Sequence, residues 1–525
     1  MHVPNHRRPG RFNRTKEVHV YDVHVGLDPA FSVGTVDPRI YGSFVEHMGR
    51  CVYGGIFEPD HPTADEHGFR KDVAELVREL GVTNVRYPGG NFVSNYRWED
   101  GVGPVQDRPK RLDLAWRSIE PNTVGVDEFA HWTRGLDLDP VMAVNLGTRG
   151  VRAAVDLLEY CNLPAGSTSL ADRRAANGRR EPHGIRTWCL GNEMDGPWQI
   201  GHKTADEYGR LAAETARAMR RTDPDIELVV CGSSNSGMPT FGSWERTVLE
   251  HTYDLVDHIS LHAYYEPVAG DIDSFLTSSE NMRGMISAVT ATADHVAAVK
   301  RSRKRITVSF DEWNVWYQSR FPGEAGLAIR PGGPLIEDVY DVTDAVVVGD
   351  LLMALLDNAD RVAIANQAQL VNVIAPIRTE PGNSAWRQTI FHPFALTAKY
   401  ARGTVLQTQV RGPLLATGQH GDVPATRVSA VHDPATGGLT LLATNRDRHR
   451  PAALNVSLRA FAGEGHRLVE HLTLGDSDPG ATNSADRPDR VTPRPVDGTT
   501  VRDGQLEATL PPTSWHLIRL HPAQS

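Results

Sequence analysis

The chain has 525 residues, of which 40% are hydrophobic and 23% are charged, and its formal net charge is −10. This length accommodates two domains. The acidic balance lacks the basic stripe of a nucleic-acid-binding protein, and no apolar run approaches the roughly 20 residues that span a bilayer. We therefore expect neither a nucleic-acid partner nor a membrane partner.

The cysteines and the N-terminal residues indicate where in the cell the protein is located. Four cysteines occur, and none stands in a C-x-x-C pair, so neither a zinc site nor a redox motif is indicated. The chain begins MHVPNHRRPGRFNRTKE, which is basic but has no hydrophobic segment after it. These features predict a disordered tail over residues 1–16 and a reducing, cytoplasmic location.

We expect residues 17–39 to form the first ordered segment of the chain. Most of this segment alternates between apolar and polar residues, which is typical of a half-buried strand. It precedes the main body of the chain. We expect it to add one or more strands to a sheet built from the C-terminal residues.

Residues 40–400 repeat one theme, in which a short apolar run is followed by an amphipathic stretch. Between the runs, apolar residues recur three or four apart, as in RKDVAELVREL and TDAVVVGDLLMALLDN. Strands that alternate with helices predict a parallel sheet, and eight units predict a closed (β/α)₈ barrel. The eight runs are RIYGSF, VTNVRYP, PVMAVNL, IRTWCL, IELVVCG, VDHISLHAY, RITVSF and RVAIANQ.

Helical periodicity stops near residue 401. Short alternating runs such as GLTLLATNR and AALNVSLRAF follow, separated by Gly, Pro and Asp. This pattern is typical of an antiparallel β-sandwich over residues 401–525. The stretch from Gly475 to Thr500 is rich in Asp, Pro, Ser and Thr, and we expect it to be a long surface loop.

In a (β/α)₈ barrel the active site lies at the carboxyl ends of the strands, so the polar residues that end the eight runs are the candidates for chemistry. They include carboxylates, amides, a histidine and aromatic residues, but no phosphate-binding glycine loop and no dense His/Cys cluster. We therefore expect no cofactor and no catalytic metal. The candidates are Glu46, Arg86, Asn91, Asn145, Asn192, Glu193, His262, Tyr264, Asp311, Glu312, Trp313, Asn366, Gln367 and Gln369.

Glu193 and Glu312 are the two carboxylates that we expect to face each other. They end the fourth and the seventh run, and strands three apart in an eight-stranded ring have nearly opposite ends. Two facing carboxylates are the minimum for glycoside hydrolysis. Amides that bind hydroxyl groups and aromatic rings that stack on sugars stand at neighbouring strand ends.

Seven segments in collinear order resemble glycoside hydrolase family 51, the α-L-arabinofuranosidases. An Asn-Glu pair after the fourth strand is shared by a large clan of retaining barrel enzymes, whereas EHMGRCVYGG and RYPGGNF narrow the resemblance to this family. The segments are YGSFVEHMGRCVYGGIFEP, NVRYPGGNFVSNYRWEDGVGP, IEPNTVGVDEF, WCLGNEMDGPWQIGHK, ISLHAYY, FDEWNVWY and AQLVNVIAP.

The resemblance implies a retaining, exo-acting, intracellular α-L-arabinofuranosidase with a barrel and a jelly-roll sandwich. It implies that Glu193 is the general acid/base and Glu312 the nucleophile, and that Asn192 binds the sugar 2-hydroxyl. It further implies arabinofuranosyl-containing oligosaccharides as substrates and a homo-oligomer, a hexamer in many members. The preferred linkage, and the choice between polymer and short oligosaccharide, stay open.

The resemblance also assigns supporting residues. Glu46, Asn91 and Gln369 match residues that bind hydroxyl groups of the sugar on the non-reducing side of the cleaved bond. His262 and Tyr264 match residues that orient the catalytic carboxylates. Three further residues each have two possible roles. Arg86 either pairs with a catalytic carboxylate or forms a structural salt bridge. Trp116 and Trp316 either line the leaving-group side or pack in the core.

Two other functions remain open. A different retaining enzyme of the same clan, such as a β-xylosidase or an endoglucanase, would share the carboxylate pair and differ in the sugar pocket. A non-catalytic carbohydrate-binding protein on a decayed barrel is the other alternative. The presence of both carboxylates and of the whole set of strand-end residues argues against it.

Overall fold

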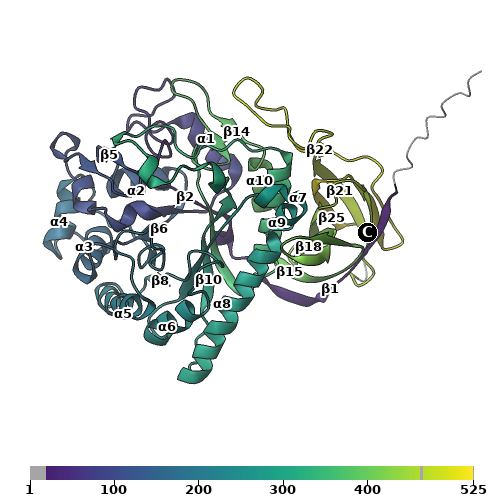
Figure 1. Cartoon of the computed structure of the whole chain (residues 1–525), viewed down its shortest axis with the longest axis horizontal. Coiled ribbons are helices and arrows are strands. Elements are labelled where there is room, and N and C mark those ends of the chain that lie inside the picture. The colour runs from purple at the N-terminus through teal and green to yellow at the C-terminus, as the bar shows by residue number, and fades with distance from the viewer. Residues whose placement is uncertain (1–18, 462–464, 524–525) are drawn as a thin grey trace, which may run out of the picture.

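A computed structural model describes residues 19–461 and 465–523. The tail expected over residues 1–16 lies outside the described residues. Figure 1 shows two parts side by side, a barrel ringed by helices and a curved sheet that holds the C-terminal residues. No helix in the described ranges is both long and apolar enough to cross a membrane.

Eight parallel strands close into a barrel, which confirms the predicted fold class. Such strands are buried on both faces, which is why each appeared in the sequence as a continuous apolar run. In order around the ring they are β2 (Gly42–Phe44), β3 (Asn84–Tyr87), β6 (Asp139–Ala143), β7 (Thr187–Cys189), β8 (Glu227–Val230), β9 (His258–Tyr265), β10 (Thr307–Val315) and β12 (Val362–Gln367).

The first apolar run, RIYGSF, is only half strand. Its first residues belong to a 3₁₀ helix, η1 (Pro38–Tyr41). Asp37 caps this helix by accepting a hydrogen bond from the Arg39 amide, and a proline stands at its start. Both features favour a helical turn over a strand.

A helix of ten residues or more follows each barrel strand, and the shorter helices α4 (Ser169–Ala176) and α7 (Ile272–Leu276) add to those after β6 and β9. The N-terminus of α5 carries a capping box, since Thr204 and Glu207 exchange side-chain and backbone hydrogen bonds. The eight longer helices are α1 (Lys71–Leu80), α2 (Val126–Gly135), α3 (Val151–Asn162), α5 (Ala205–Thr222), α6 (Ser243–Thr252), α8 (Ser279–Lys300), α9 (Val342–Leu356) and α10 (Phe391–Tyr400).

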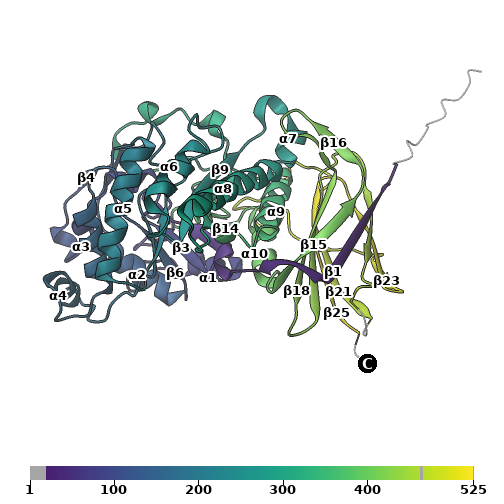
Figure 2. The same cartoon turned by 90° about the horizontal axis from the view of Figure 1, so that it is seen from below.

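The α9 helix differs from its amphipathic prediction, because every residue in it except Thr343 is buried. It lies between the barrel and the C-terminal sheet (Figure 2) and contacts α8, α10, β19 (Gly438–Asn445) and β25 (Ser514–Pro522). Packing is tight, since a Cβ atom at Gly349 would overlap the Trp515 ring. A helix covered on all sides is mostly apolar all round. The two buried acids of α9, Asp344 and Asp350, both accept hydrogen bonds.

The C-terminal residues form a ten-stranded, mostly antiparallel sheet around a hydrophobic core of its own. β1 (Tyr21–Thr35) lies within this sheet, antiparallel to β15 and parallel to β20. Its other members are β15 (Thr404–Arg411), β18 (Thr426–Asp433), β20 (Ala452–Ser457), β21 (His466–Leu474), β22 (Arg494–Pro495), β23 (Thr500–Arg502), β24 (Gln505–Leu510) and the already named β19 and β25.

One hairpin of the C-terminal part leaves this sheet. Its strands β16 (Leu414–Thr417) and β17 (Gly421–Pro424) pair only with each other. They reach the short helix α7 (Ile272–Leu276), which follows β9 of the barrel (Figure 2). The sequence pattern gave no sign that this hairpin contacts the barrel.

Candidate active site

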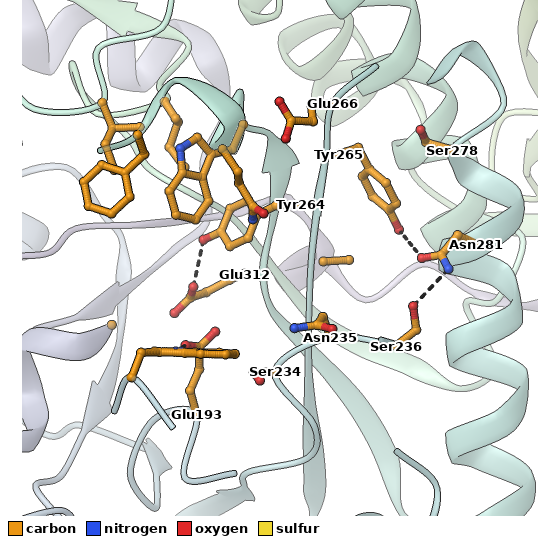
Figure 3. Close-up of a pocket in the computed structure, with 18 of the residues that line it drawn as sticks. Glu193, Ser234, Asn235, Ser236, Tyr264, Tyr265, Glu266, Ser278, Asn281 and Glu312 are labelled. Atoms are coloured by element: carbon orange, nitrogen blue, oxygen red, sulfur yellow. Dashed lines mark hydrogen bonds between the residues drawn. The ribbon is translucent and has the colours of Figure 1, made fainter. Parts of the chain in front are cut away.

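One cavity of about 680 Å³ opens at the carboxyl ends of the barrel strands, where the sequence predicted the site. Glu193 and Glu312 both line it (Figure 3). Of the other predicted residues, the lining includes Glu46, Asn91, Tyr264, Gln369, Trp116 and Trp316. Arg86, Asn192 and His262 do not line it themselves, but each hydrogen bonds to a residue that does.

Glu312 lies in β10 and is almost fully buried. Its Oε1 accepts a hydrogen bond from Nη1 of Arg86 at 2.8 Å, and its Oε2 accepts one from the Tyr264 hydroxyl at 2.7 Å. Burial raises the pKa of this carboxyl, but the charges of His262 and Arg86 and the hydrogen bond from Tyr264 outweigh burial. The pKa of Glu312 therefore lies below its usual value, and the carboxylate form is favoured.

Glu193 follows β7 in a loop, and its backbone has a positive φ of 43°. Few residues other than glycine adopt this conformation, and such strain is found mostly at functional sites. Oε1 of Glu193 lies 2.9 Å from Nδ1 of His262, and Oε2 accepts a hydrogen bond from the Trp198 indole at 2.6 Å. A tryptophan and a histidine thus hydrogen bond to this carboxyl, whereas an arginine contacts Glu312.

His262 connects the two carboxyl groups. Its Nδ1 lies 2.9 Å from Glu193 and 3.6 Å from Glu312. Burial lowers the pKa of the imidazole, but the charge of Glu312 and the hydrogen bond to Glu193 outweigh burial, so the pKa lies above its usual value. The His262 imidazole therefore keeps its proton to a higher pH than a free histidine does.

The two carboxyl groups are close together. Oxygens of Glu193 and Glu312 and Nδ1 of His262 all lie within 4.8 Å of one another. Retaining glycosidases hold their carboxyl groups about 5–5.5 Å apart, and inverting enzymes hold them about 6.5–9.5 Å apart to leave room for a water molecule. The spacing fits attack by one carboxylate on the sugar.

These three residues could also hold a metal ion, a grouping that their sequence spacing did not reveal. However, Arg86 and Tyr264 already contact both oxygens of Glu312. The guanidinium charge 2.8 Å from Glu312 would repel a cation at this place. The charge of Arg86 therefore disfavours a metal ion at this trio.

Arg86 forms ion pairs with two carboxylates at once. Besides Glu312, it contacts Asp311, with Nε 3.5 Å from Oδ2, and its Nη2 donates to Oδ1 of Asn192 at 2.7 Å. The side chain is 1% exposed. One buried arginine thus holds a catalytic candidate and turns the Asn192 amide so that its NH₂ group points away from Arg86.

Glu46, Trp116 and Gln369 close the cavity on one side of the carboxylate pair. The Trp116 indole and the Gln369 amide donate to the Glu46 carboxyl at 2.7 Å and 3.1 Å. Burial raises the pKa of Glu46 well above its usual value, despite the hydrogen bond from Trp116. A Cβ atom at Gly90 would overlap the Glu46 carboxyl, which explains the glycine beside Asn91 in the RYPGGNF segment.

Trp116 and Trp316, each of which had two possible roles in the sequence, both line the cavity. Trp116 is buried, and its indole donates to Glu46. Trp316 packs edge-on against Tyr264, with ring centres 5.1 Å apart. Its buried indole nitrogen has no hydrogen-bond partner among the described residues.

Several lining residues were not singled out from the sequence. Trp198 stands five residues after Glu193 in the same loop, so its position was a signal that could have found it. Tyr265 ends β9, within the ISLHAYY segment, which was a second signal. The others come from loops and a helix that carry no motif, and they are Asn235 and Ser236 after β8, Asn281 in α8, and Gln419 and His420 in the turn of the β16–β17 hairpin.

A closed (β/α)₈ barrel that holds two carboxylates this close, beside amides and aromatic rings, has the fold and site of a glycoside hydrolase. Two family models match the chain, "Alpha-L-arabinofuranosidase 1 domain" over residues 76–281 and "Alpha-L-arabinofuranosidase C-terminal domain" over residues 311–514. The chain belongs to glycoside hydrolase family 51, the α-L-arabinofuranosidases.

Individual relatives agree with this family. An intracellular exo-α-(1→5)-L-arabinofuranosidase of Streptomyces lividans is 59% identical over 94% of this chain and 74% of its own length. An exo-α-(1→6)-L-arabinofuranosidase of Bifidobacterium longum is 51% identical over 94% of this chain and 96% of its own length. The solved structure of a family 51 α-L-arabinofuranosidase from the same species has a TM-score of 0.91 and 47% identity, covering 96% of this chain and all of that one.

Proposed function

We propose that this enzyme releases terminal α-L-arabinofuranosyl residues from oligosaccharides by double displacement, with Glu312 as nucleophile and Glu193 as general acid/base. One observation carries the assignment: oxygens of the two carboxyl groups lie within 4.8 Å of each other in different electrostatic surroundings. Arg86 contacts Glu312 but not Glu193. This asymmetry supports the division of roles.

In the first step the Glu312 carboxylate attacks the anomeric carbon while a proton passes from Glu193 to the leaving oxygen. The depressed pKa of Glu312 keeps the nucleophile ionised. His262 hydrogen bonds to Glu193 and orients it, and the water molecule of the second step returns the proton that Glu193 gives up. A covalent arabinosyl–enzyme ester forms, and the leaving sugar departs with the proton.

In the second step Glu193, now a carboxylate, takes a proton from a water molecule that attacks the ester. Two inversions give net retention at the anomeric carbon. The amide NH₂ group of Asn192 is free to bind the sugar 2-hydroxyl, because Arg86 occupies its oxygen. Tyr264 donates to Glu312 in the resting state and steadies it for attack.

The closed side of the cavity supports exo action. Glu46 and Gln369 are each 2% exposed and Trp116 is 8% exposed, so no path for a longer chain continues past them. We propose that they and Asn91 bind the hydroxyl groups of a single terminal sugar. Because burial favours the neutral form of Glu46, its carboxyl can donate as well as accept a hydrogen bond.

We further propose an intracellular place of action and a homo-oligomeric assembly. Relatives named intracellular, together with four buried free cysteines, support an intracellular place of action for this enzyme. Assembly into a homo-oligomer, a hexamer in the form that the family resemblance implies, stays a prediction. Light scattering behind a sizing column measures it directly.

A panel of nitrophenyl glycosides tests the function. We expect rapid hydrolysis of the α-L-arabinofuranoside and at least about a hundredfold lower kcat/KM on β-D-xyloside and cellobioside, because the closed pocket fits one terminal sugar. Proton NMR of the first product should show retained α configuration. A preference for the xyloside or for a glucan would favour the other clan activities, and a first product of inverted configuration would refute the double displacement.

A further inference from the structure

A short hairpin carries Trp116 into the catalytic cavity. Its strands β4 (Arg111–Leu112) and β5 (Ser118–Glu120) are antiparallel, and residues 113–117 form the turn between them. Trp116 lies in this turn, lines the catalytic cavity and donates its indole N–H to Glu46. The conformation of the turn therefore decides whether this part of the cavity wall is in place.

Asp113 fixes the turn from within. Its Oδ1 accepts a hydrogen bond from the Ala115 amide at 3.1 Å, and its Oδ2 accepts one from the Trp116 amide at 2.9 Å. The side chain is 3% exposed, although its neighbours Leu112 and Leu114 are exposed. Acids are usually exposed and leucines usually buried, so this part of the hairpin reverses the common arrangement. The two bonds to the turn explain why an acid is buried here.

The backbone beside Trp116 is strained. Arg117 follows it with a positive φ of 53°. A residue other than glycine rarely adopts this conformation, which costs about 1–3 kcal/mol and persists only where the surrounding structure fixes it. The bonds from Asp113 supply part of that constraint, so the turn can relax when they weaken.

A second cavity, which we term the side cavity, lies behind the turn. It has a volume of about 180 Å³ and is lined by Asp113. Among the described residues, none lines both the side cavity and the catalytic cavity. The lining includes the exposed side chains of Arg97, Arg111 and Leu112, so the side cavity reaches the surface. Protons can therefore reach Asp113 from solvent while a sugar fills the catalytic cavity.

The charge of Asp113 changes not far below neutral pH. Burial raises the pKa of this carboxyl to about 6, because the bonds from the Trp116 and Ala115 amides offset burial only in part. The charge of Glu120 raises the pKa further, and that of His47 lowers it. Hydrogen bonds to a charged acceptor are roughly twice as strong as those to a neutral one. Protonation of Asp113 therefore weakens both of its bonds to the turn.

Other titratable and charged groups face Asp113 directly or across the side cavity. Glu120 pairs with His47 at 2.9 Å, and Asp100 pairs with Arg111 at 2.8 Å. These two acids thus have basic partners, whereas the hydrogen bonds of Asp113 come from backbone amides. The full set is Glu46, His47, Tyr96, Arg97, Asp100, Arg111 and Glu120.

We propose that Asp113 is a positioning residue for the sugar pocket: its carboxylate holds the turn that places Trp116 against Glu46, and its protonation through the side cavity weakens binding of the terminal sugar. The inference rests on the proposed function, which assigns Glu46 to a sugar hydroxyl group. The Trp116–Glu46 bond already exists in the resting enzyme, so its loss weakens binding of substrate and transition state alike. Such a loss raises KM and leaves kcat nearly unchanged.

The test measures KM and kcat for nitrophenyl α-L-arabinofuranoside, and Ki for L-arabinose, between about pH 7.5 and about pH 5, on either side of the pKa of Asp113. In the wild type we expect KM and Ki to rise about 3- to 10-fold as pH falls, the effect of one or two neutral hydrogen bonds. Asp113→Asn cannot ionise. Its KM should already be raised about 3- to 10-fold at the higher pH and should stay constant on acidification, with kcat changed less than about twofold.

Asp100→Asn is the matched control, since Asp100 lines the same side cavity but bonds to Arg111 rather than to the turn. It should keep the wild-type KM and its dependence on pH. Trp116→Phe keeps an aromatic ring and removes the indole N–H. It should raise KM and abolish the pH dependence as Asp113→Asn does, so it remains informative if Asp113→Asn impairs folding.

Three results overturn the positioning role. They are a wild-type KM that does not change over this pH range, an Asp113→Asn enzyme that keeps the wild-type rise, and a loss of the rise in Asp100→Asn. An equal fall of kcat and kcat/KM in Asp113→Asn also contradicts it, because that is the result of general structural damage. Failure of the wild type to hydrolyse the aryl arabinofuranoside would instead refute the proposed function.

Discussion

Arg86 at the barrel mouth and Arg446 at the junction between α8, α9 and the C-terminal sheet are both almost fully buried among carboxylates. At the junction, Arg446 contacts Asp350 and Glu280, and Arg427 contacts Asp357. None of these five side chains has a buried nitrogen or oxygen without a hydrogen-bond partner.

The barrel mouth is different. Nε2 of His262, Oε1 of Gln369, the Ser234 hydroxyl and the Trp316 indole are all buried without a partner among the described residues. Leaving such atoms unpaired costs free energy, about 1–3 kcal/mol each. The ion pairs of the junction are thus fully bonded and suited to holding two domains together, whereas the mouth leaves several polar groups free to bind a ligand.

The catalytic pair offers the largest test of this difference. Glu312→Ala should lower kcat by at least about 10⁴-fold on every substrate, because it removes the nucleophile. Glu193→Ala should lower it by about 10²–10⁴-fold on natural substrates and far less on aryl substrates, whose leaving groups need no proton. Steady-state kinetics on both substrate classes measures the effect.

Azide separates the two roles. In Glu193→Ala it should attack the ester intermediate and give an arabinosyl azide with the configuration of the substrate. In Glu312→Ala it should enter the space of the lost carboxylate and give the inverted azide. If NMR finds these products exchanged, the roles of the two residues are exchanged as well.

Substitutions at the junction should lower the free energy of unfolding rather than the catalytic activity. Asp350 accepts hydrogen bonds from Thr444 and Arg446, so Asp350→Ala leaves buried arginine charge with fewer partners. We expect the free energy of unfolding to fall by about 3–5 kcal/mol, with kcat of the folded enzyme unchanged. Urea unfolding and kinetics at low temperature measure both.

Asp360→Ala is the control for Asp350→Ala, because Asp360 forms an ion pair with Arg305 at the surface. Surface pairs contribute about 0–1 kcal/mol, so this variant should be nearly as stable as wild type. A loss of activity in Asp350→Ala that matches its loss of stability would show that the junction and the mouth do not differ as described.

Buried histidines of the C-terminal sheet should produce the smallest effect. His471 hydrogen bonds to Thr499 and to His516, which burial keeps uncharged. Burial lowers the pKa of His471 to about 4, against about 6.5 in the unfolded chain. The unfolded state therefore binds more protons between these values, so stability is full above about pH 6.5 and falls as pH drops toward 4.

The contribution of His471 to this fall is at most about 3 kcal/mol, at 1.36 kcal/mol per pKa unit. His471→Gln should make the decline of the free energy of unfolding between pH 6.5 and 4 shallower. His24→Gln, at an exposed position of β1, should leave it unchanged. A decline of the same steepness in wild type and His471→Gln would refute the assignment.

Much of the barrel and its catalytic end could be predicted because the signals are local. Each barrel strand appears as an apolar run, and Glu193 and Glu312 stand directly after or within such runs. The buried character of α9 could not be predicted, since it depends on a sheet made later in the chain. The hairpin turn at Gln419 was missed for the same reason: its partner, Ser274, is far away in sequence. Contacts between distant segments leave no period in the sequence.

The place of β1 in the C-terminal sheet has a consequence for synthesis. Tyr21 pairs with Ala452 and His24 with Arg411, so β1 is made long before either neighbour exists. At about 5–20 residues per second, a ribosome needs tens of seconds to reach them. During that time Val23 and Val25, buried in the finished sheet, lie on a strand with two unpaired edges. Nascent chains of this enzyme are therefore most exposed to aggregation at their oldest end, and binding of a chaperone to this strand should matter more than binding to the barrel.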